Sequence, residues 1–337
     1  MTIKVGIDGY GQRGNVFKQR LTLTENLKNL YDLVGVYDSN PNVRDEISRD
    51  DSSFTVFKSH KEMFENVDLV INCTSTEAHY KTTSSALKVG KDVLLEKPST
   101  LHWKQDLKLK KLSEDGGNLV AVGYVEPFNP AILYMVKNID PKSINLVLIM
   151  RYGPMPAHRK GDSRTIPDLS SHDIDWLNFW LKKEPQLIYA TEDEQHGFVR
   201  LKYDSLDAYL HAERISGSGF RHRTAIVYGT QNYWELDLAS QKVIIGGPSE
   251  TGTIDPNIYS LLSWKHQMKL SENIETPITS IEKKEPLEQL LVTLGESIQK
   301  RKILQPLRSI SESTVTTKII EEACRMTEKN KSKKYQS

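Results

Sequence analysis

The sequence has little cysteine, no long apolar run and almost no net charge. Only Cys73 and Cys324 occur among 337 residues, and neither lies in a CxxC or Cys/His cluster, which argues against a disulfide framework or a zinc site. No apolar stretch approaches the roughly 18 to 20 residues of a membrane span, and the amino terminus lacks the pattern of a signal peptide. We therefore expect a soluble, cytoplasmic protein that needs no metal.

The charges balance, since 45 basic and 44 acidic side chains leave a formal charge of +1. No net field draws such a chain to nucleic acid or to an anionic membrane, so neither is expected as a partner. Any anion must be held by a local site. The chain is also longer than the about 250 to 300 residues at which single cores stop growing, which predicts two domains.

A glycine motif follows the first apolar stretch, residues 3–8. It reads Gly9, Tyr10, Gly11, Gln12, Arg13 and Gly14. In a nucleotide-binding turn, Gly9 permits the tight bend, Gly11 lets the backbone approach a pyrophosphate, and Gly14 lets the following helix pack closely. The amino terminus of that helix would then face the anion. The motif alone is a weak signal, because an unrelated α/β domain can contain a glycine-rich turn.

Asp38 strengthens the signal because it ends the second apolar stretch, residues 32–37. Its carboxylate would accept hydrogen bonds from both hydroxyls of an adenosine ribose and would repel a 2′-phosphate, which favours NAD over NADP. Ser39, Asn40 and Arg44 stand close by and leave NADP possible. Together the glycines and Asp38 predict a dinucleotide site.

Apolar strands alternate with helical stretches up to about residue 123. The predicted strands are 3–8, 32–37, 53–57, 68–73, 92–95 and 118–122. This rhythm predicts an α/β Rossmann domain over 1–123, with a parallel, doubly wound sheet. One of its helices should run from 76 to 89 and end at Gly90.

From residue 124 the pattern becomes that of an α+β domain. A strand at 145–150 and a helix near 173–182 precede four or five strands between 187 and 246, several of which alternate apolar and polar residues. The links between these strands are hairpin-like, as in Tyr203-Asp204-Ser205, which predicts a mainly antiparallel sheet. The alternation predicts one apolar and one polar face.

The second domain is expected over 124–302, and its polar face could meet solvent, a substrate or another subunit. Helices are predicted at 284–299 and 312–328. The carboxy-terminal helix, within about 303–330, is expected to pack back on the first domain.

Glu96, Lys97 and Pro98 come directly after the predicted strand 92–95, at the sheet edge where open α/β sheets bind ligands. A lysine beside an oxidised nicotinamide would have its pKa lowered by that positive charge. It could then exchange a proton with a reacting hydroxyl or hydrogen-bond to it. The alternative is an ordinary surface lysine.

Asp168 and His172 stand four residues apart before the predicted helix near 173–182. On a helix they would share one face, so that a carboxylate and an imidazole could reach one ligand. The ordinary pKa of histidine suits acid–base catalysis near neutral pH. The alternative is that Asp168 caps the helix and His172 is a buried, hydrogen-bonded histidine.

Small polar residues end the predicted strand 68–73 at the same sheet edge. Thr74 and Ser75, with His79 in the following helix, could line the path of the ribose and nicotinamide. Ordinary serine and threonine turns before a helix are the alternative.

These motifs, in this order, resemble those of the Gfo/Idh/MocA oxidoreductases, the glucose–fructose oxidoreductase and inositol dehydrogenase family, over nearly the whole chain. The matching residues are Gly9 to Gly14, Cys73-Thr74-Ser75 with His79, Glu96-Lys97-Pro98, Gly123-Tyr124 with Phe128-Asn129-Pro130, and Asp168 with His172. The resemblance implies an α/β Rossmann domain followed by an α+β substrate-binding and oligomerisation domain, whose open, mainly antiparallel sheet often makes subunit contacts, with substrate held between the two domains. It also implies a homodimer or homotetramer.

The resemblance also implies roles. Lys97 would orient the substrate hydroxyl and help to deprotonate it, His172 would be the principal acid–base group, and Asp168 would hydrogen-bond to the substrate. The implied cofactor-binding residues are Gly9, Tyr10, Gly11, Gln12, Arg13, Asp38, Thr74, Ser75, His79, Glu96 and Lys97. The implied substrate-binding residues are Lys97, Tyr124, Asn129, Arg151, Asp168 and His172.

Residues 151–159 and 232–237 look most like the nucleotide-sugar branch, such as UDP-N-acetylglucosamine 3-dehydrogenases. The arginines that could contact a diphosphate are Arg151, Arg159, Arg221 and Arg223, unless they are solvated surface charges. The chain departs from the family at Cys73, Ser75 and Pro127, and Pro127 puts the substrate in doubt. We therefore expect an NAD(P)-dependent sugar or nucleotide-sugar dehydrogenase. The alternatives are a free-sugar or inositol dehydrogenase, an enzyme that reduces a non-sugar carbonyl, and a non-catalytic NAD(P)-binding regulator.

Overall fold

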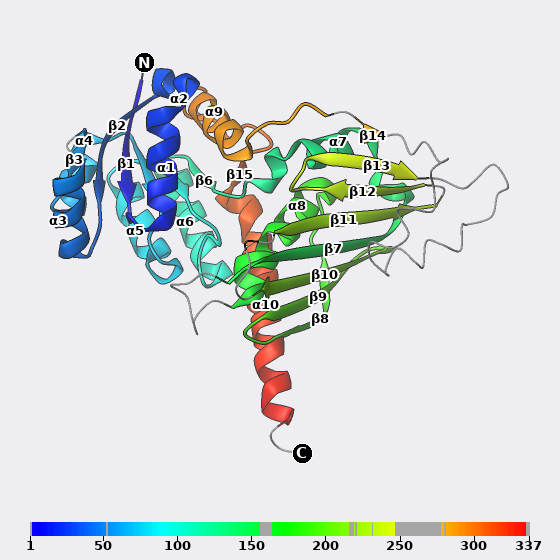
Figure 1. Cartoon of the computed structure of the whole chain (residues 1–337). Coiled ribbons are helices and arrows are strands. Elements are labelled where there is room, and N and C mark those ends of the chain that lie inside the picture. Colours follow the sequence, from blue (N-terminus) through cyan, green and yellow to red (C-terminus); the bar gives the residue numbers. More distant parts are fainter. Residues whose placement is uncertain are drawn as a thin grey trace.

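The chain forms two sheets that stand side by side, with a long helix, α10, between them (Figure 1). The computed structural model describes residues 2–51, 53–155, 164–215, 219, 221–230, 232–246, 278–279 and 281–334. Within these residues no helix is both long and apolar enough to cross a membrane.

The first sheet has the strand order β15-β6-β5-β4-β1-β2-β3. Its strands are β1 (Ile3–Asp8), β2 (Tyr31–Tyr37), β3 (Thr55–Val56), β4 (Leu69–Asn72), β5 (Asp92–Leu95), β6 (Val120–Val122) and β15 (Arg308–Ser309). All neighbours pair in parallel except β15, which is antiparallel to β6. The predicted doubly wound parallel sheet is confirmed, whereas β15 was not predicted.

Helices cover both faces of this sheet. They are α1 (Gln12–Leu23), α2 (Glu25–Leu30), α3 (Pro41–Asp50), α4 (His60–Asn66), α5 (Thr76–Lys88) and α6 (Trp103–Gly116). Every residue of β4 and β5 is buried, as expected for strands covered on both sides. Helix α5 ends just before Gly90, whose φ of 78° lies in the left-handed region that glycine tolerates.

The second sheet has the order β14-β13-β12-β11-β7-β10-β9-β8. Its strands are β7 (Ile144–Pro154), β8 (Gln186–Glu192), β9 (His196–Tyr203), β10 (Leu206–Ile215), β11 (His222–Gly229), β12 (Tyr233–Asp237), β13 (Lys242–Gly246) and β14 (Ile278–Thr279). Only β7 and β10 pair in parallel, so the predicted mainly antiparallel sheet is confirmed. Six strands (β8 to β13) occupy the region where four or five were predicted.

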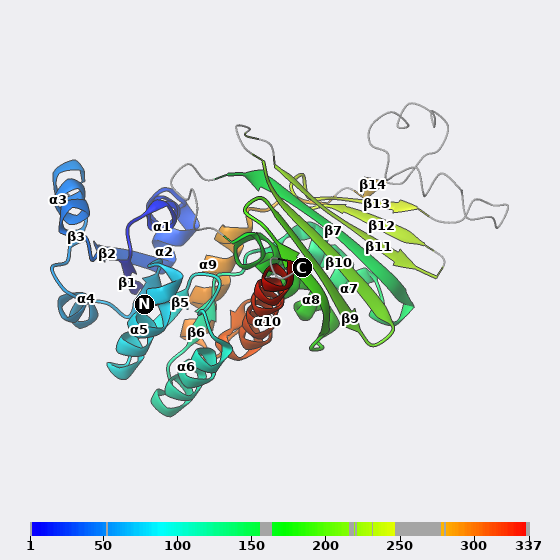
Figure 2. The same ribbon diagram turned by 90° about the horizontal axis from the view of Figure 1, so that it is seen from below.

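The remaining helical segments lie against this sheet or between the two sheets. They are η1 (Glu126–Phe128), α7 (Pro130–Asn138), η2 (Pro141–Ser143), η3 (Ile166–Ser170), α8 (Ser171–Leu181), α9 (Pro286–Gln299) and α10 (Ile310–Lys334). Figure 2 shows α8 and α10 beneath one face of the sheet.

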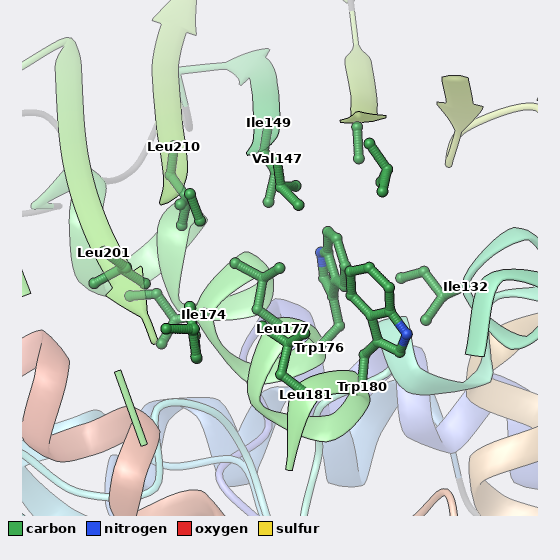
Figure 3. Close-up of a cluster of buried hydrophobic side chains, with 14 of the residues drawn as sticks. Ile132, Val147, Ile149, Ile174, Trp176, Leu177, Trp180, Leu181, Leu201 and Leu210 are labelled. Carbon is green, nitrogen blue, oxygen red and sulfur yellow. The ribbon is translucent and has the colours of Figure 1, made fainter. Parts of the chain in front are cut away.

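Helix α8 is held by its apolar side chains. Trp176, Leu177 and Trp180 are buried against Val147 and Ile149 of β7 (Figure 3). Burial of each such side chain stabilises by roughly 1.5 to 3 kcal/mol, against about 1 kcal/mol for a helix cap. No side chain of the described residues caps the start of α8. Sheet packing therefore fixes the helix that carries His172.

The last two helices divide between the domains differently from the expected boundary at 302. Four leucines of α9 join the core of the first domain, and the Tyr31 hydroxyl donates to the Leu291 carbonyl at 2.6 Å. Helix α9 therefore packs with the first domain. Helix α10 contacts both domains, since Ile319 lies in the second core and Thr317 hydrogen-bonds to Ser99 at 2.8 Å.

Candidate active site

The glycine motif forms a cradle with open space at its centre. Gly9 has a φ of 90°, and a Cβ there would lie 2.7 Å from the Cys73 carbonyl. A Cβ on Gly14 would lie 2.2 Å from the Gly9 oxygen, whereas one on Gly11 would meet nothing within 4 Å. Packing thus requires Gly9 and Gly14, and Gly11 faces the space that a pyrophosphate would fill. Helix α1 begins there without a side-chain cap from the described residues, so its first N–H groups suit an anion.

Asp38 lies at the end of β2 and is fixed beside the motif. Its Oδ2 accepts from the Tyr10 N–H at 2.9 Å, and its Oδ1 accepts from the Asn40 N–H at 2.8 Å. Arg44 donates to the carbonyl oxygens of Asp38, at 2.6 Å, and of Ser39, at 3.2 Å. A carboxylate and a guanidinium therefore stand together where an adenosine ribose would bind.

Arg13 and Glu96 join helix α1 to the carboxyl end of β5. Arg13 donates to Glu96 Oε1 from Nε at 2.9 Å and from Nη2 at 2.5 Å. The charge of Glu96 raises the pKa of Arg13. Glu96 Oε2 also accepts from the Lys97 N–H at 3.1 Å, so this pair fixes the start of the turn that carries Lys97.

His79 braces two turns at the same edge. The ring is buried, with Nε2 at 3.1 Å from the Thr74 carbonyl oxygen and Nδ1 at 3.0 Å from that of Pro98. Burial lowers its pKa. Ser75 precedes α5 at the cap position. The predicted cofactor residues Thr74 and Ser75 do reach the edge, but His79 supports it from behind.

Asp106 anchors the segment that follows Lys97. It is fully buried, and its carboxylate accepts from the Ser99 hydroxyl at 2.7 Å and the Thr100 hydroxyl at 2.8 Å. Burial raises the pKa of Asp106 to about 6. The folded state therefore favours the protonated carboxyl. The stability that this proton contributes is lost as the pH rises through about 6.

Asp106→Asn is expected to remove this pH dependence. The free energy of unfolding of the wild type, measured relative to that of Asp106→Asn, should fall by about 1 kcal/mol between about pH 5 and about pH 8. Urea denaturation at both pH values measures the difference, and other titrating groups cancel because both proteins contain them. A difference that stays constant with pH would contradict this account of Asp106.

Lys97 and Asp168 meet between the two domains. Lys97 Nζ donates to Asp168 Oδ1 at 2.7 Å and to the Asp168 carbonyl oxygen at 2.7 Å. Arg214 of β10 forms an ion pair with the other carboxylate oxygen, Oδ2. Arg214 was not among the predicted site residues. Its one signal in the sequence is the alternation along β10: Arg214 falls on the same inward-facing positions as Ala212, where a charge is unusual.

The segment around Asp168 is a π-helix, η3, rather than the expected α-helical turn. Glu192 anchors it by accepting from the Ile166 N–H at 3.0 Å and from Arg164 Nε at 2.5 Å. A single π turn inserts one residue into a helix and occurs often at functional sites. Here it precedes α8 and turns Asp168 towards Lys97.

His172 stands partly buried in the first turn of α8. Burial, then the charges of Lys97 and Arg151, lower its pKa well below the ordinary value. Its ring meets the edge of Tyr124, with ring centroids 6.2 Å apart. The imidazole is therefore neutral at neutral pH and offers one lone pair to a proton.

Two predicted substrate residues lie behind the site. Tyr124 is fully buried under His172. Asn129 is 3% exposed, accepts from the Ala131 N–H at 3.1 Å as the cap of α7, and donates to the Leu238 carbonyl at 2.8 Å. Packing thus occupies Tyr124 and capping occupies Asn129, and contact of either with substrate stays a prediction.

Arg151 requires a correction. It is 2% exposed and donates to both oxygens of Asp173, at 2.8 and 2.7 Å, and to Glu126 at 2.9 Å. Against the burial of Glu126, the charges of Arg151 and Arg223 hold the pKa of that carboxyl below its usual range. Arg151 therefore holds β7 to α8 and η1 and is not placed to contact a diphosphate.

Arg223 is the half-buried member of this cluster. Its side chain is 35% exposed and lies 3.5 Å from Glu126. Its positive charge also helps to lower the pKa of His172. Arg221 is exposed, and Arg159 lies outside the described residues. No group of three His, Cys, Asp or Glu side chains suited to a metal occurs in the described part of the chain.

Comparisons with known proteins match the first domain and the overall fold. Residues 3–124 match the model of the Gfo/Idh/MocA family, described as an oxidoreductase family with an NAD-binding Rossmann fold. The chain is 31% identical to an inositol 2-dehydrogenase/D-chiro-inositol 3-dehydrogenase of Lactiplantibacillus plantarum over 53% of this chain and 52% of the relative. It is 25% identical to a UDP-N-acetylglucosamine 3-dehydrogenase of Acidithiobacillus ferrooxidans, over 54% and 56%.

The chain thus spans about half the length of these curated relatives. A solved structure of the Acidithiobacillus ferrooxidans UDP-N-acetylglucosamine 3-dehydrogenase superposes with a TM-score of 0.77 at 18% identity, over 97% of both chains. At that identity the superposition shows a shared fold. The family model therefore matches the first domain, and the chain as a whole shares the two-domain fold of that solved dehydrogenase.

Proposed function

We propose that the chain is an NAD-dependent dehydrogenase that oxidises a secondary hydroxyl of a sugar or nucleotide sugar. The observation that carries this proposal is the meeting of Lys97, Asp168 and neutral His172 beside the dinucleotide cradle. A regulator that only binds dinucleotide has no need of this acid–base set.

The side chains divide the chemistry between them. A bound nicotinamide would supply the hydride acceptor, as in other dehydrogenases. Lys97, paired with Asp168 at 2.7 Å, would donate a hydrogen bond to the substrate oxygen, which would make that hydroxyl more acidic. His172 takes the hydroxyl proton.

NAD rather than NADP is proposed because Asp38 faces the ribose side. Asp38→Ala is expected to raise kcat/KM for NADP relative to NAD about tenfold or more, since it removes the repulsion of a 2′-phosphate and leaves Arg44 beside it. The matched control is Asp45→Ala, an exposed aspartate on α3, which should leave the preference unchanged. An unchanged preference in Asp38→Ala would show that Asp38 does not read the ribose.

A nucleotide sugar is proposed as the substrate, with an inositol or free sugar as the second candidate. The charges around the site favour the first: Lys97, Arg151, Arg214 and Arg223 face the three carboxylates of Glu126, Asp168 and Asp173. One surplus positive charge suits an anionic substrate. The inositol dehydrogenase relative supports the second candidate.

The test is NADH formation across UDP-sugars, free sugars and inositols. Turnover on a UDP-sugar well above that on its free sugar supports the nucleotide-sugar branch. Turnover only on inositols or free sugars selects the second candidate. Dinucleotide binding with no hydride transfer to or from any of these compounds overturns the proposal that the chain is an enzyme.

We also propose a homodimer or homotetramer that uses the outer face of the second sheet, which no described helix covers and which bears the exposed Ile188 and Tyr189. Light scattering of the purified chain tests this, and a monomer at working concentration would refute it.

A further inference from the structure

Asp168 lies between two cations that come from different domains. Lys97 reaches Oδ1 from the end of β5, and Arg214 reaches Oδ2 from β10. The Arg214 side chain is 5% exposed, whereas that of Asp168 is 24% exposed. The carboxylate is therefore engaged on both oxygens before any substrate arrives.

The fold brings Arg214 to this place through the parallel pair of β7 and β10. Arg214 lies opposite Gly153 in the register of the two strands, and a Cβ on Gly153 would meet nothing within 4 Å. Arg214 Nη1 donates to the Pro154 carbonyl at 3.2 Å. A buried guanidinium without a counter-charge is costly, so Arg214 and Asp168 stabilise one another at the end of the sheet nearest the first domain.

We propose that Arg214 is a positioning residue: it holds Asp168 against Lys97 and offsets the carboxylate charge, so that the Lys97 ammonium donates more strongly to the substrate oxygen. This inference rests on the proposed function. In the proposed oxidation the alcohol would become a ketone: His172 would take the hydroxyl proton, and NAD, when bound, would supply the hydride acceptor. Lys97 keeps its proton and stabilises the developing negative charge on oxygen.

Arginine suits this role because it stays charged at every working pH. Other charged or titratable groups surround Lys97 and Asp168: Glu96 and Arg13 from the first domain, His172 from α8, and Arg151 and Arg223 from the second sheet. Glu96 is paired with Arg13, and Arg151 with Asp173 and Glu126. Arg214 is thus the cation that touches the carboxylate opposite Lys97.

The test measures the Lys97 amine directly and then turnover. In cofactor-free protein whose lysines carry ¹³C-methyl groups, the Lys97 resonance, assigned by its absence in Lys97→Ala, is titrated in the wild type and in Arg214→Gln. Loss of the neighbouring positive charge should raise the pKa of Lys97 by about one unit. The pKa that defines the alkaline limb of the pH profile of kcat should rise by the same amount. The maximal kcat should fall several-fold, with KM little changed.

Two variants complete the design. Arg214→Lys keeps the charge and should leave the pKa of Lys97 near the wild-type value, which also provides a reading if Arg214→Gln does not fold. Arg200→Gln removes an exposed charge of β9, paired with Asp207, and should change nothing. The proposal is overturned if Arg214→Gln lowers kcat at every pH without moving the Lys97 titration, or if Arg214→Lys moves it as far as Arg214→Gln. The amine titration needs no substrate, so a failure of the proposed function is seen separately, as absence of turnover in the wild type.

Discussion

Replacing Lys97 by alanine is expected to lower kcat about a thousandfold while dinucleotide binding stays within about threefold of the wild-type value. The Lys97 ammonium is the donor held at 2.7 Å from Asp168, and no second cation reaches the same point from the first domain among the described residues. The cradle of Gly9, Gly11 and Gly14 lies on another part of the edge and is unaffected. Stopped-flow NADH absorbance and a fluorescence titration of the dinucleotide separate the two effects.

The matched control is Lys88→Ala, which removes an exposed lysine of α5 in the same domain. It should leave kcat and dinucleotide affinity unchanged. Lys97→Ala with near wild-type kcat would mean that Lys97 only pairs with Asp168 across the domains and takes no part in chemistry.

Replacing Arg151 by methionine is expected to lower the free energy of unfolding by about 3 to 5 kcal/mol, and Tm by roughly 10 °C. Methionine matches the length of the arginine stem, but it leaves the carboxylates of Glu126 and Asp173, 3% and 2% exposed, without their cation. Two unpaired buried charges destabilise the folded state by more than the buried methionine side chain stabilises it. Chemical denaturation measures the change directly.

Arg200→Met is the control, because it breaks an ion pair of the same sheet whose arginine is 39% exposed. Exposed pairs contribute about 0 to 1 kcal/mol, so this variant should stay close to the wild type. Equal stability of the two variants would show that the buried cluster does not hold α8 to β7.

Much of the first domain was predictable because its signals are local. The turn at Gly9 to Gly14 needs particular backbone geometry within six residues, and Asp38 and Lys97 each follow a strand that the apolar pattern marks. Parallel strands end at one edge, so local motifs in separate loops converge there. The pattern of burial in β4 and β5 follows from the same apolar runs.

The second domain was less predictable because its decisive contacts are non-local. Whether Arg151 is exposed depends on Glu126 and Asp173, 25 and 22 residues away. The approach of Arg214 to Asp168 depends on the parallel pairing of β7 and β10, whereas the hairpin-like links suggested an antiparallel sheet. Asn129 belongs to a family motif, yet its own position before Pro130 already suits a helix cap.

A chain that moves a hydride between a sugar carbinol carbon and NAD must carry a label from that carbon into the nicotinamide. The most direct test supplies NAD with a UDP-sugar deuterated at its ring carbinol carbons, alongside matched inositols, and follows deuterium into the reduced nicotinamide by mass spectrometry. We expect one deuterium per NADH formed, with the signal lost in Lys97→Ala. Tight NAD binding with no label in the nicotinamide, for any of these substrates, would contradict it and leave a dinucleotide-binding protein that performs no oxidation.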